Sequence, residues 1–235
     1  MTPVSSVPQR RTVRGRILEE GEMGDWREAR TLEELYQAIK DCTRCELART
    51  RTHLVFGVGD PRAEIMFVGE APGYHEDRQG LPFVGPAGQF LDQLLRSIGL
   101  SRDQVYIANT LKCRPPDNRD PLPGELETCT PYLFKQIELI NPRIICTLGN
   151  HATRTLLRTS TGITQLHGKV IRKDSLVCVP LFHPAAALHK PPLKAVLVDD
   201  FLKLGKYLEE ERKRWEVMSR EPAKVETEPE QMGLF

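Results

Sequence analysis

The stretch Ala63-Glu64-Ile65-Met66-Phe67-Val68-Gly69 is a short apolar run that ends in a glycine. Three runs of the same kind follow it, at residues 105–108, 143–149 and 176–182. Continuous apolar runs of this length, bounded by turn residues, are typical of strands that are buried on both faces of a sheet. The sequence therefore predicts four strands in the middle of a parallel sheet.

Helical patterns separate these predicted strands. Apolar side chains recur at helical spacing in four segments, at residues 87–100, 126–140, 152–157 and 196–216. Before the first strand, the capping box Thr31-Leu32-Glu33-Glu34 predicts a helix that continues to about Lys40. Strands that alternate with helices favour a three-layer α/β/α sandwich with a central, mostly parallel four-stranded sheet.

Composition bounds the rest of the chain. Of its 235 residues 40% are hydrophobic, and the net charge is only +1, so nucleic acid could be bound only through a local basic patch. We expect a flexible leader at residues 1–30, one domain at residues 31–215 and a disordered tail at residues 216–235. No apolar run approaches the ~18 residues of a membrane span, and the leader contains no secretory signal. We expect a monomeric, cytoplasmic and nucleoid-associated protein with no membrane partner.

Unusual residues follow three of the predicted strands. Gly69-Glu70-Ala71-Pro72-Gly73 comes after the first, Asn109 after the second and His183-Pro184 after the last. Each feature alone also fits an ordinary turn or cap. Because ligands bind at the carboxyl ends of the strands in such sheets, the three together predict one pocket.

These segments resemble the family 4 uracil-DNA glycosylases, which are iron–sulfur enzymes that remove uracil from DNA. The similarity also includes Gly80-Leu81-Pro82-Phe83-Val84-Gly85-Pro86-Ala87-Gly88 and Asn109-Thr110-Leu111-Lys112-Cys113-Arg114-Pro115-Pro116, and it spans about residues 31 to 210. Glu70 stands where the sibling family 5 enzymes have an apolar residue, which favours family 4.

The resemblance implies base excision repair, in which uracil is extruded from DNA and its N-glycosidic bond is hydrolysed to leave an abasic site. Uracil leaves as an anion while the sugar becomes cationic, so hydrogen-bond donors are needed at the base. By resemblance, His183 donates to uracil O2, and Glu70 positions the attacking water or stabilises the sugar. The family 1 relatives place an aspartate one position later, at Ala71 here. We expect Glu70 and His183 to be the catalytic residues.

The same resemblance implies a uracil-binding set of Gly69, Glu70, Ala71, Phe83, Asn109 and His183. The Asn109 amide can accept from N3–H and donate to O4 of uracil, whereas cytosine presents the reverse pattern. Phe83 is expected to stack on the extruded base, with an ordinary core phenylalanine as the alternative. The backbone amides of Glu70 and Ala71 help to hold the base.

Extrusion of a nucleotide from duplex DNA requires a residue that holds the gap open. Leu188 is the candidate wedge, and Lys112, Arg114 and Lys190 are expected to contact phosphates. Solvated surface charge is the alternative for each of these cations. Some relatives trap the sugar with a histidine in a basic loop, but residues 114–119 contain no histidine, so we expect hydrolytic turnover.

Four of the six cysteines have a spacing that suggests ligands. Cys42 and Cys45 form a Cys-x-x-Cys pair, whereas Cys113 and Cys129 are widely separated. A zinc ribbon would have two tight pairs and fits poorly, although a structural zinc remains the alternative. The resemblance implies a [4Fe–4S] cluster on these four cysteines. The other two lie in predicted strands and are expected to be core residues.

The chain ends in Gln231-Met232-Gly233-Leu234-Phe235. Gln231, Leu234 and Phe235 resemble the peptide by which bacterial repair proteins dock on the DNA sliding clamp, and a chance match is the alternative. The alternative to a glycosylase is a uracil-DNA binder or an iron–sulfur redox module that does not hydrolyse DNA. Release of uracil from a single-uracil oligonucleotide distinguishes these functions.

Overall fold

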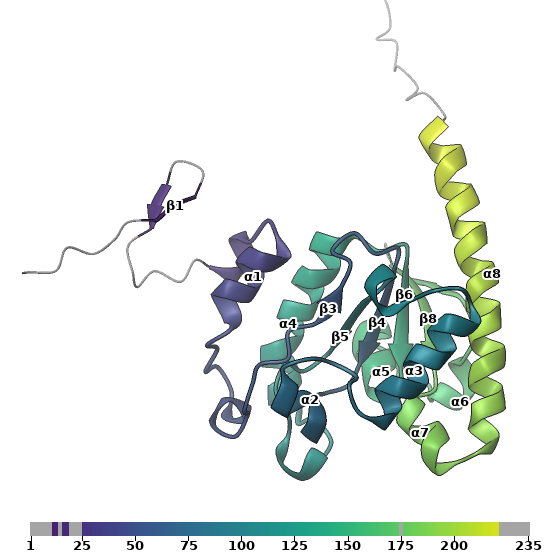
Figure 1. The fold of residues 1–235 in the computed structure, drawn as a ribbon, viewed down its shortest axis with the longest axis horizontal. Coiled ribbons are helices and arrows are strands. Elements are labelled where there is room, and N and C mark those ends of the chain that lie inside the picture. The colour runs from purple at the N-terminus through teal and green to yellow at the C-terminus, as the bar shows by residue number, and fades with distance from the viewer. Residues whose placement is uncertain (1–10, 14–15, 19–24, 174–175, 221–235) are drawn as a thin grey trace, which may run out of the picture.

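A six-stranded sheet forms the centre of the computed structural model, which describes residues 11–13, 16–18, 25–173 and 176–220 (Figure 1). The strand order is β3-β5-β4-β6-β8-β7. The strands are β3 (Val58–Gly59), β4 (Ile65–Gly69), β5 (Tyr106–Asn109), β6 (Ile144–Leu148), β7 (Ile171–Lys173) and β8 (Leu176–Leu181).

The four inner strands are parallel, as predicted, and they are β5, β4, β6 and β8. The edge strands β3 and β7 are antiparallel to their neighbours and were not predicted. They were missed because neither contains a continuous apolar run. Strand β3 has only two residues, and β7 is only partly buried. In register, Gly69 of β4 pairs with Asn109 of β5, which brings two of the predicted turns together.

Helices lie between the strands as the sequence predicted, and several short ones were not predicted. The helices are α1 (Leu32–Ile39), α2 (Tyr74–Gln79), α3 (Pro86–Ser97), α4 (Pro123–Ile140), α5 (Asn150–Leu157), α6 (Ile163–Leu166), α7 (Pro184–His189) and α8 (Pro192–Arg220). Single 3₁₀ turns are η1 (Trp26–Glu28), η2 (Glu46–Arg49), η3 (Arg102–Gln104) and η4 (Pro116–Asn118). Strands β1 (Arg11–Val13) and β2 (Arg16–Leu18) pair with each other as a separate antiparallel ribbon.

The helices form two layers over the sheet (Figure 1). The buried face of α3, α7 and α8 packs on one side, where Phe67 of β4 stacks on Phe201 of α8 with ring centroids 5.8 Å apart. Helices α4 and α5 cover the other side, through residues such as Leu133 and Leu156. Each large apolar side chain buried in these layers contributes roughly 1.5–3 kcal/mol to folding, so the core holds the strand ends in fixed positions.

A third cluster of buried residues joins α1 to α4, beside the two main layers. The Thr31 side chain caps α1 by accepting from the Glu34 N–H at 3.1 Å, as the capping box predicted. The Trp26 ring meets Tyr132 of α4 edge-on at 5.0 Å, and Ala29 is buried. Residues 25–30 therefore belong to the domain, and the expectation that the leader reaches residue 30 is wrong. Two apolar contacts are too few to produce a periodic sequence pattern.

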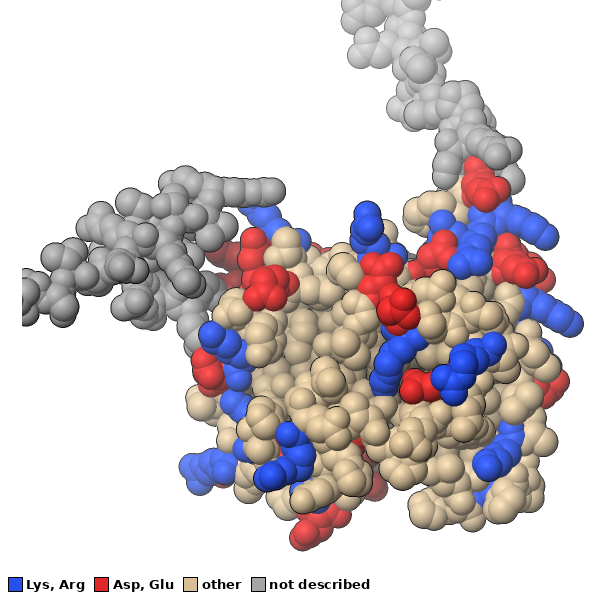
Figure 2. Space-filling view, in the orientation of Figure 1, with Lys and Arg blue, Asp and Glu red and all other residues tan. Residues whose placement is uncertain are grey.

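The C-terminal helix continues further than the sequence suggested. Helix α8 is described as far as Arg220, so residues 216–220, which were expected to be in the disordered tail, are helical. The clamp-like peptide at residues 231–235 lies outside the described residues, as do residues 1–10 of the leader. No helix in the described part of the chain combines the length and apolarity that a bilayer span needs. Figure 2 shows Lys and Arg interspersed with Asp and Glu on one face, without a continuous basic surface.

Candidate active site

The carboxyl ends of β4, β5 and β8 meet at a cavity of about 340 Å³. This volume lies within the range of about 300–1,000 Å³ that is usual for small-ligand sites. Five residues predicted to bind the base line it together, and they are Glu70, Ala71, Phe83, Asn109 and His183. Gly69, the sixth, lies directly behind Asn109 and Phe83, so the predicted convergence of three turns is what the structure contains.

Asn109 presents an acceptor atom without a partner. Its side chain is only 2% exposed, and its Oδ1 atom has no hydrogen-bond donor within the residues that the structure describes. A Cβ atom on Gly69 would overlap Oδ1 and would lie 2.7 Å from the Phe83 ring, so glycine is needed there. Because an unsatisfied buried acceptor costs about 1–3 kcal/mol, Oδ1 is suited to accept a hydrogen bond from a ligand N–H.

His183 follows β8 and supplies a hydrogen-bond donor to the lining of the same cavity. It is the N-cap of α7, and its Nδ1 atom accepts from the Ala185 N–H at 3.2 Å. The proton of the neutral ring therefore lies on Nε2. Burial lowers the pKa of His183 to about 4, because the charged imidazolium loses its hydration. His183 is thus a neutral Nε2–H donor at physiological pH.

Phe83 forms one wall of the site in an unusual backbone conformation. Its φ angle is +55°, a left-handed value that costs a non-glycine residue roughly 1–2 kcal/mol. The ring is buried and stacks on the imidazole of His183, with centroids 5.5 Å apart and planes inclined by 26°. The ring therefore belongs to the pocket, where a planar ligand would meet both aromatic side chains.

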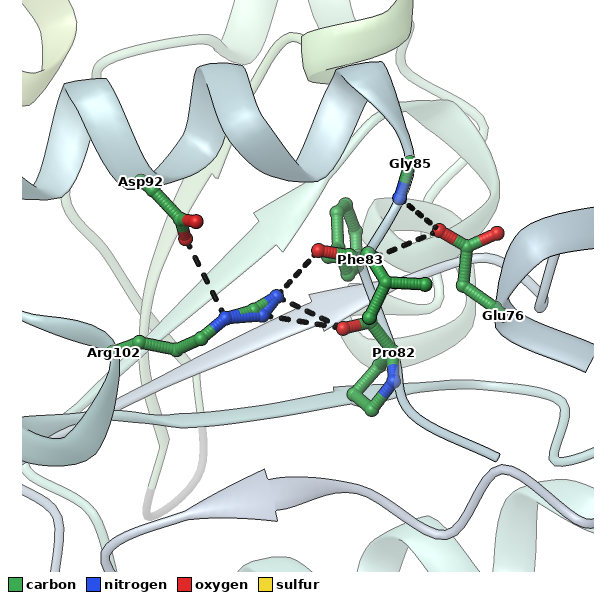
Figure 3. Close-up of polar contacts among 7 residues, drawn as sticks. Glu76, Pro82, Phe83, Gly85, Asp92 and Arg102 are labelled. Carbon is green, nitrogen blue, oxygen red and sulfur yellow. Dashed lines mark hydrogen bonds and ion pairs between the residues drawn. The ribbon is translucent and has the colours of Figure 1, made fainter. Parts of the chain in front are cut away.

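The chain around Phe83 is held from two sides (Figure 3). Glu76 of α2 accepts from the N–H groups of Val84 and Gly85, at 3.0 and 3.1 Å. On the other side, the guanidinium of Arg102 donates to the carbonyl oxygens of Pro82 and Phe83. Glu76 also lines the cavity, so one carboxylate both shapes the loop and faces the ligand space.

Glu70 follows β4 and is fixed by its main chain. Its carbonyl oxygen accepts from the Leu111 N–H at 3.0 Å and from the Thr110 hydroxyl at 2.5 Å. Its carboxylate Oε2 lies 3.8 Å from Nε2 of His151, which is 3.6 Å from Asp120. Burial raises the pKa of Glu70, the charge of His151 opposes that shift, and Asp120 adds to it. A carboxylate with these neighbours can orient water or stabilise a positive charge.

Lys112 does not contact solvent, so the prediction that it binds a phosphate is wrong. The side chain is 1% exposed, and its Nζ donates to the Asn109 carbonyl oxygen at 2.9 Å and to Gln136 Oε1 at 2.5 Å. The loop after β5 turns inward at this residue, which a charge pattern in the sequence does not reveal. Lys112 instead fixes the main chain of the residue that carries the orphan acceptor.

The other predicted DNA contacts lie at the surface. Leu188 of α7 is 40% exposed, five residues after His183, and Lys190 follows it in an exposed position. Arg114 is partly exposed, and its Nε donates to Asn118 Oδ1 at 2.7 Å, while its guanidinium lies 5.3 Å from the centroid of the Tyr74 ring. Arg114 is next to Pro115, and Leu188 is three residues after Ala185, and both Pro115 and Ala185 line the cavity.

The four spaced cysteines gather in the cluster between α1 and α4. Cys113 and Cys129 are buried, Cys42 and Cys45 are partly buried, and all four are free thiols. Within the described ranges, no three of them have sulfur atoms that all lie within 4.8 Å of one another. Tetrahedral zinc with thiolates at ~2.3 Å would bring each pair to ~3.8 Å. Among these described cysteines, no three sulfurs therefore have the close spacing of a four-thiolate zinc site.

Hydrogen-bond donors surround these sulfur atoms. The Lys112 N–H donates to Cys129 Sγ at 3.2 Å, and Arg51 Nη1 donates to Cys113 Sγ at 3.4 Å. Burial raises the pKa of Cys129 to about 12, so an unligated thiol there stays protonated. Burial lowers the pKa of Lys112 to about 8, and the nearby sulfurs of Cys129 and Cys113 oppose that shift. Donors and a buried cation suit metal-bound thiolates, which carry negative charge.

Comparison with known families assigns this arrangement. The family model described as "Uracil DNA glycosylase superfamily" matches residues 56–205, which include every strand end at the pocket. The chain belongs to the uracil DNA glycosylase superfamily. This membership accounts for the α/β sandwich and for the position of the cavity.

Curated members of the superfamily show the same relationship over most of the chain. A protein named Type-4 uracil-DNA glycosylase from Sulfurisphaera tokodaii is 46% identical over 74% of this chain and 83% of its own length. Another of that name from Archaeoglobus fulgidus is 44% identical over 74% of this chain and 92% of its own length. A Type-5 uracil-DNA glycosylase from Pyrobaculum aerophilum is 34% identical over 54% of this chain and 63% of its length. The Type-4 members thus match more of the chain, in agreement with the family 4 features of its sequence.

Sequence reasoning missed several residues of this superfamily member's pocket. Glu76, Asn118 and Arg119 line the cavity and were not predicted. Arg119 pairs with Glu125 at 2.6 Å, and its side chain is 37% exposed. Glu76 lies in the short helix α2, three residues after its N-cap Gly73. A prediction of that helix would have been the signal that could locate Glu76 near the Phe83 loop.

Proposed function

We propose that this protein is a uracil-DNA glycosylase that extrudes uracil from DNA and hydrolyses the N-glycosidic bond, leaving an abasic site for base excision repair. The observation that carries the proposal is the pairing of an orphan acceptor with a neutral donor in one cavity. Among the described residues Asn109 Oδ1 has no donor, and the contact of His183 Nδ1 with the Ala185 N–H leaves Nε2–H as the donor of the ring. The names of the Type-4 relatives support the same reaction.

Base recognition follows from the hydrogen-bonding edge of uracil. Asn109 accepts from uracil N3–H at Oδ1 and donates to O4 from its amide nitrogen, while Phe83 stacks on the ring. Cytosine has no proton on N3 and an amino group in place of O4. It would leave Oδ1 and the amide donor unpaired in a buried site, which is a strong ground for rejection.

Bond cleavage requires charge stabilisation at both the base and the sugar. As the bond breaks, the uracil anion gains charge on O2, where the fixed His183 Nε2–H donates a hydrogen bond that strengthens in the transition state. The Glu70 carboxylate faces the cationic sugar or holds the attacking water. We further propose that Leu188 fills the gap left by the extruded base, while Arg114 and Lys190 contact phosphates.

The pH dependence of excision should follow Glu70. Its carboxylate is active when ionised, and burial raises its pKa above the ordinary value of 4.5, so activity should fall as the pH decreases through that raised value. His183 has a pKa of about 4, so its ring is neutral above about pH 5. Single-turnover rates between about pH 5 and 8 should show an acid limb that is absent in Glu70→Gln. An unchanged acid limb in that variant would assign the titration to another group.

Uracil release is the direct test of the function. A single-uracil oligonucleotide should lose its uracil at enzyme excess, and alkali should then cleave the strand at the abasic position. Retention of the base, with tight binding of the same oligonucleotide, would support the alternative of a uracil-DNA binder without hydrolysis.

We also propose that Cys42, Cys45, Cys113 and Cys129 hold a [4Fe–4S] cluster. The spacing of the described sulfurs favours this group over zinc, and the donors to Cys129 and Cys113 suit metal-bound thiolates. Such a cluster supplies a rigid covalent connection here rather than a reacting centre. The residues themselves join the α1 region to the loop that begins after Asn109, through Cys113 and Lys112.

The cluster proposal makes a spectroscopic prediction. The purified protein should be brown, with broad absorbance near ~400 nm and about four iron atoms per chain. Cys129→Ser should lose that absorbance and unfold at a lower temperature, because its buried ligand position is emptied. Cys178→Ser, in β8 and away from this region, should keep the absorbance. A colourless protein with one zinc per chain would contradict the proposal.

A further inference from the structure

We propose that Arg102, supported by Asp92, is a positioning residue for base binding, because it holds Phe83 in the conformation that forms the wall of the pocket. The inference rests on the proposed function and adds a residue that the base never touches. Arg102 lies in η3, just before β5, and its side chain is 28% exposed. It therefore acts from behind the pocket, on the loop between α2 and α3.

The contacts of Arg102 converge on two successive carbonyl groups (Figure 3). Nη2 donates to the Phe83 carbonyl oxygen at 2.5 Å and to the Pro82 carbonyl oxygen at 2.9 Å, and Nη1 reaches the latter at 3.3 Å. Nε forms an ion pair with Asp92 Oδ1 of α3 at 3.4 Å, which holds the guanidinium by charge and not by a hydrogen bond. The planar fork of arginine makes this geometry possible, and a lysine could not reproduce it.

The opposite side of the loop is equally constrained. Glu76 fixes the N–H groups of Val84 and Gly85, so the peptide units before and after Phe83 are both held. A Cβ atom on Gly88 of α3 would overlap the Phe83 carbonyl group, which shows how closely that helix approaches. The backbone at Phe83 is thus held by hydrogen bonds to Glu76 and Arg102 and by close packing against the backbone of α3.

These contacts are needed because the backbone of Phe83 is in a disfavoured conformation. At a φ of +55° the residue is strained, and such strain persists only where surrounding contacts determine the backbone. If Arg102 is removed, the loop can relax, and the ring would leave its stack on His183 and its contact with Gly69. The slot for the base would lose a wall, while the hydrogen-bonding atoms of Asn109 and His183 would stay in place.

The expected effect is therefore on binding more than on bond cleavage. In Arg102→Gln we expect KM for a single-uracil oligonucleotide to rise about 10-fold and inhibition by free uracil to weaken about 10-fold. The rate constant at saturation should change by less than about 3-fold. Arg102→Lys should show an intermediate loss, since it keeps a charge near Asp92 but lacks the fork, and Asp92→Asn should show a smaller one.

Controls separate this role from simpler ones. Arg96→Gln changes an exposed arginine of α3 and should leave KM, uracil inhibition and unfolding temperature unchanged. The slope of log KM against log salt should be the same in Arg102→Gln and the parent, because the residue does not contact phosphate. A reduced slope would overturn the inference, and so would unchanged inhibition by free uracil.

If Arg102→Gln fails to fold, the same measurements on Arg102→Lys and Asp92→Asn test the positioning role. Absence of uracil release by the parent would refute the proposed function, whereas calorimetric binding of free uracil would still test the positioning role.

Discussion

Replacing His183 with alanine should lower the single-turnover rate of uracil excision by about 10²–10³-fold, the usual loss when one donor to a developing anion is removed. His183 supplies Nε2–H in a partly buried cavity, where its hydrogen bond to the leaving base is not replaced by water. Binding of the oligonucleotide should change far less, because the interaction strengthens mainly in the transition state.

Two companion variants sharpen that result. His183→Asn can cap α7 and offer an N–H donor, so it should recover part of the lost rate. His189→Ala removes an exposed histidine from the end of the same helix and should behave as the parent. A His183→Ala rate within about 3-fold of the parent would assign anion stabilisation to another group.

Replacing Asn109 with aspartate should change which base the pocket accepts. The carboxylate has no donor for uracil O4, so uracil excision should fall by about 10²-fold or more. Cytosine presents an amino group in that position, which a carboxylate accepts, so the ratio of uracil to cytosine release should fall sharply. Base-release assays on matched uracil- and cytosine-containing oligonucleotides measure the rate of uracil excision and the ratio of uracil to cytosine release.

The control for this change is Asn150→Asp. Asn150 begins α5, and its Oδ1 accepts from the Ile163 N–H at 2.8 Å, which a carboxylate can also do. It should keep the parent's preference for uracil. An Asn109→Asp protein that still rejects cytosine as the parent does would show that another residue reads the base.

The sequence predicted the parts of the fold that depend on continuous patterns. The four apolar runs correspond to the four parallel inner strands, and the turn residues after three of them line one cavity. The parallel arrangement makes this possible, because it brings carboxyl ends to the same edge of the sheet. The capping box at Thr31 likewise specified the start of α1 through a local hydrogen bond.

Features set by tertiary contacts could not be predicted in the same way. Lys112 looks like a surface cation in the sequence, but it is buried because Gln136 and the Asn109 carbonyl accept its hydrogen bonds. Arg102 lies 19 positions from Phe83, and only the folded loop brings them together. The packing of residues 25–30, which extends the domain to residue 25, depends on the contact of Trp26 with Tyr132 and on the burial of Ala29.

The most direct test of the account is a crystal structure with an oligonucleotide that carries a 2′-fluorinated deoxyuridine, which resists hydrolysis because fluorine disfavours a positive charge on the sugar. The account predicts that Asn109 Oδ1 accepts from N3–H and His183 Nε2 donates to O2 of one extruded uracil ring stacked on Phe83. A base that stays in the helix, or one that contacts only one of these two side chains, would contradict it.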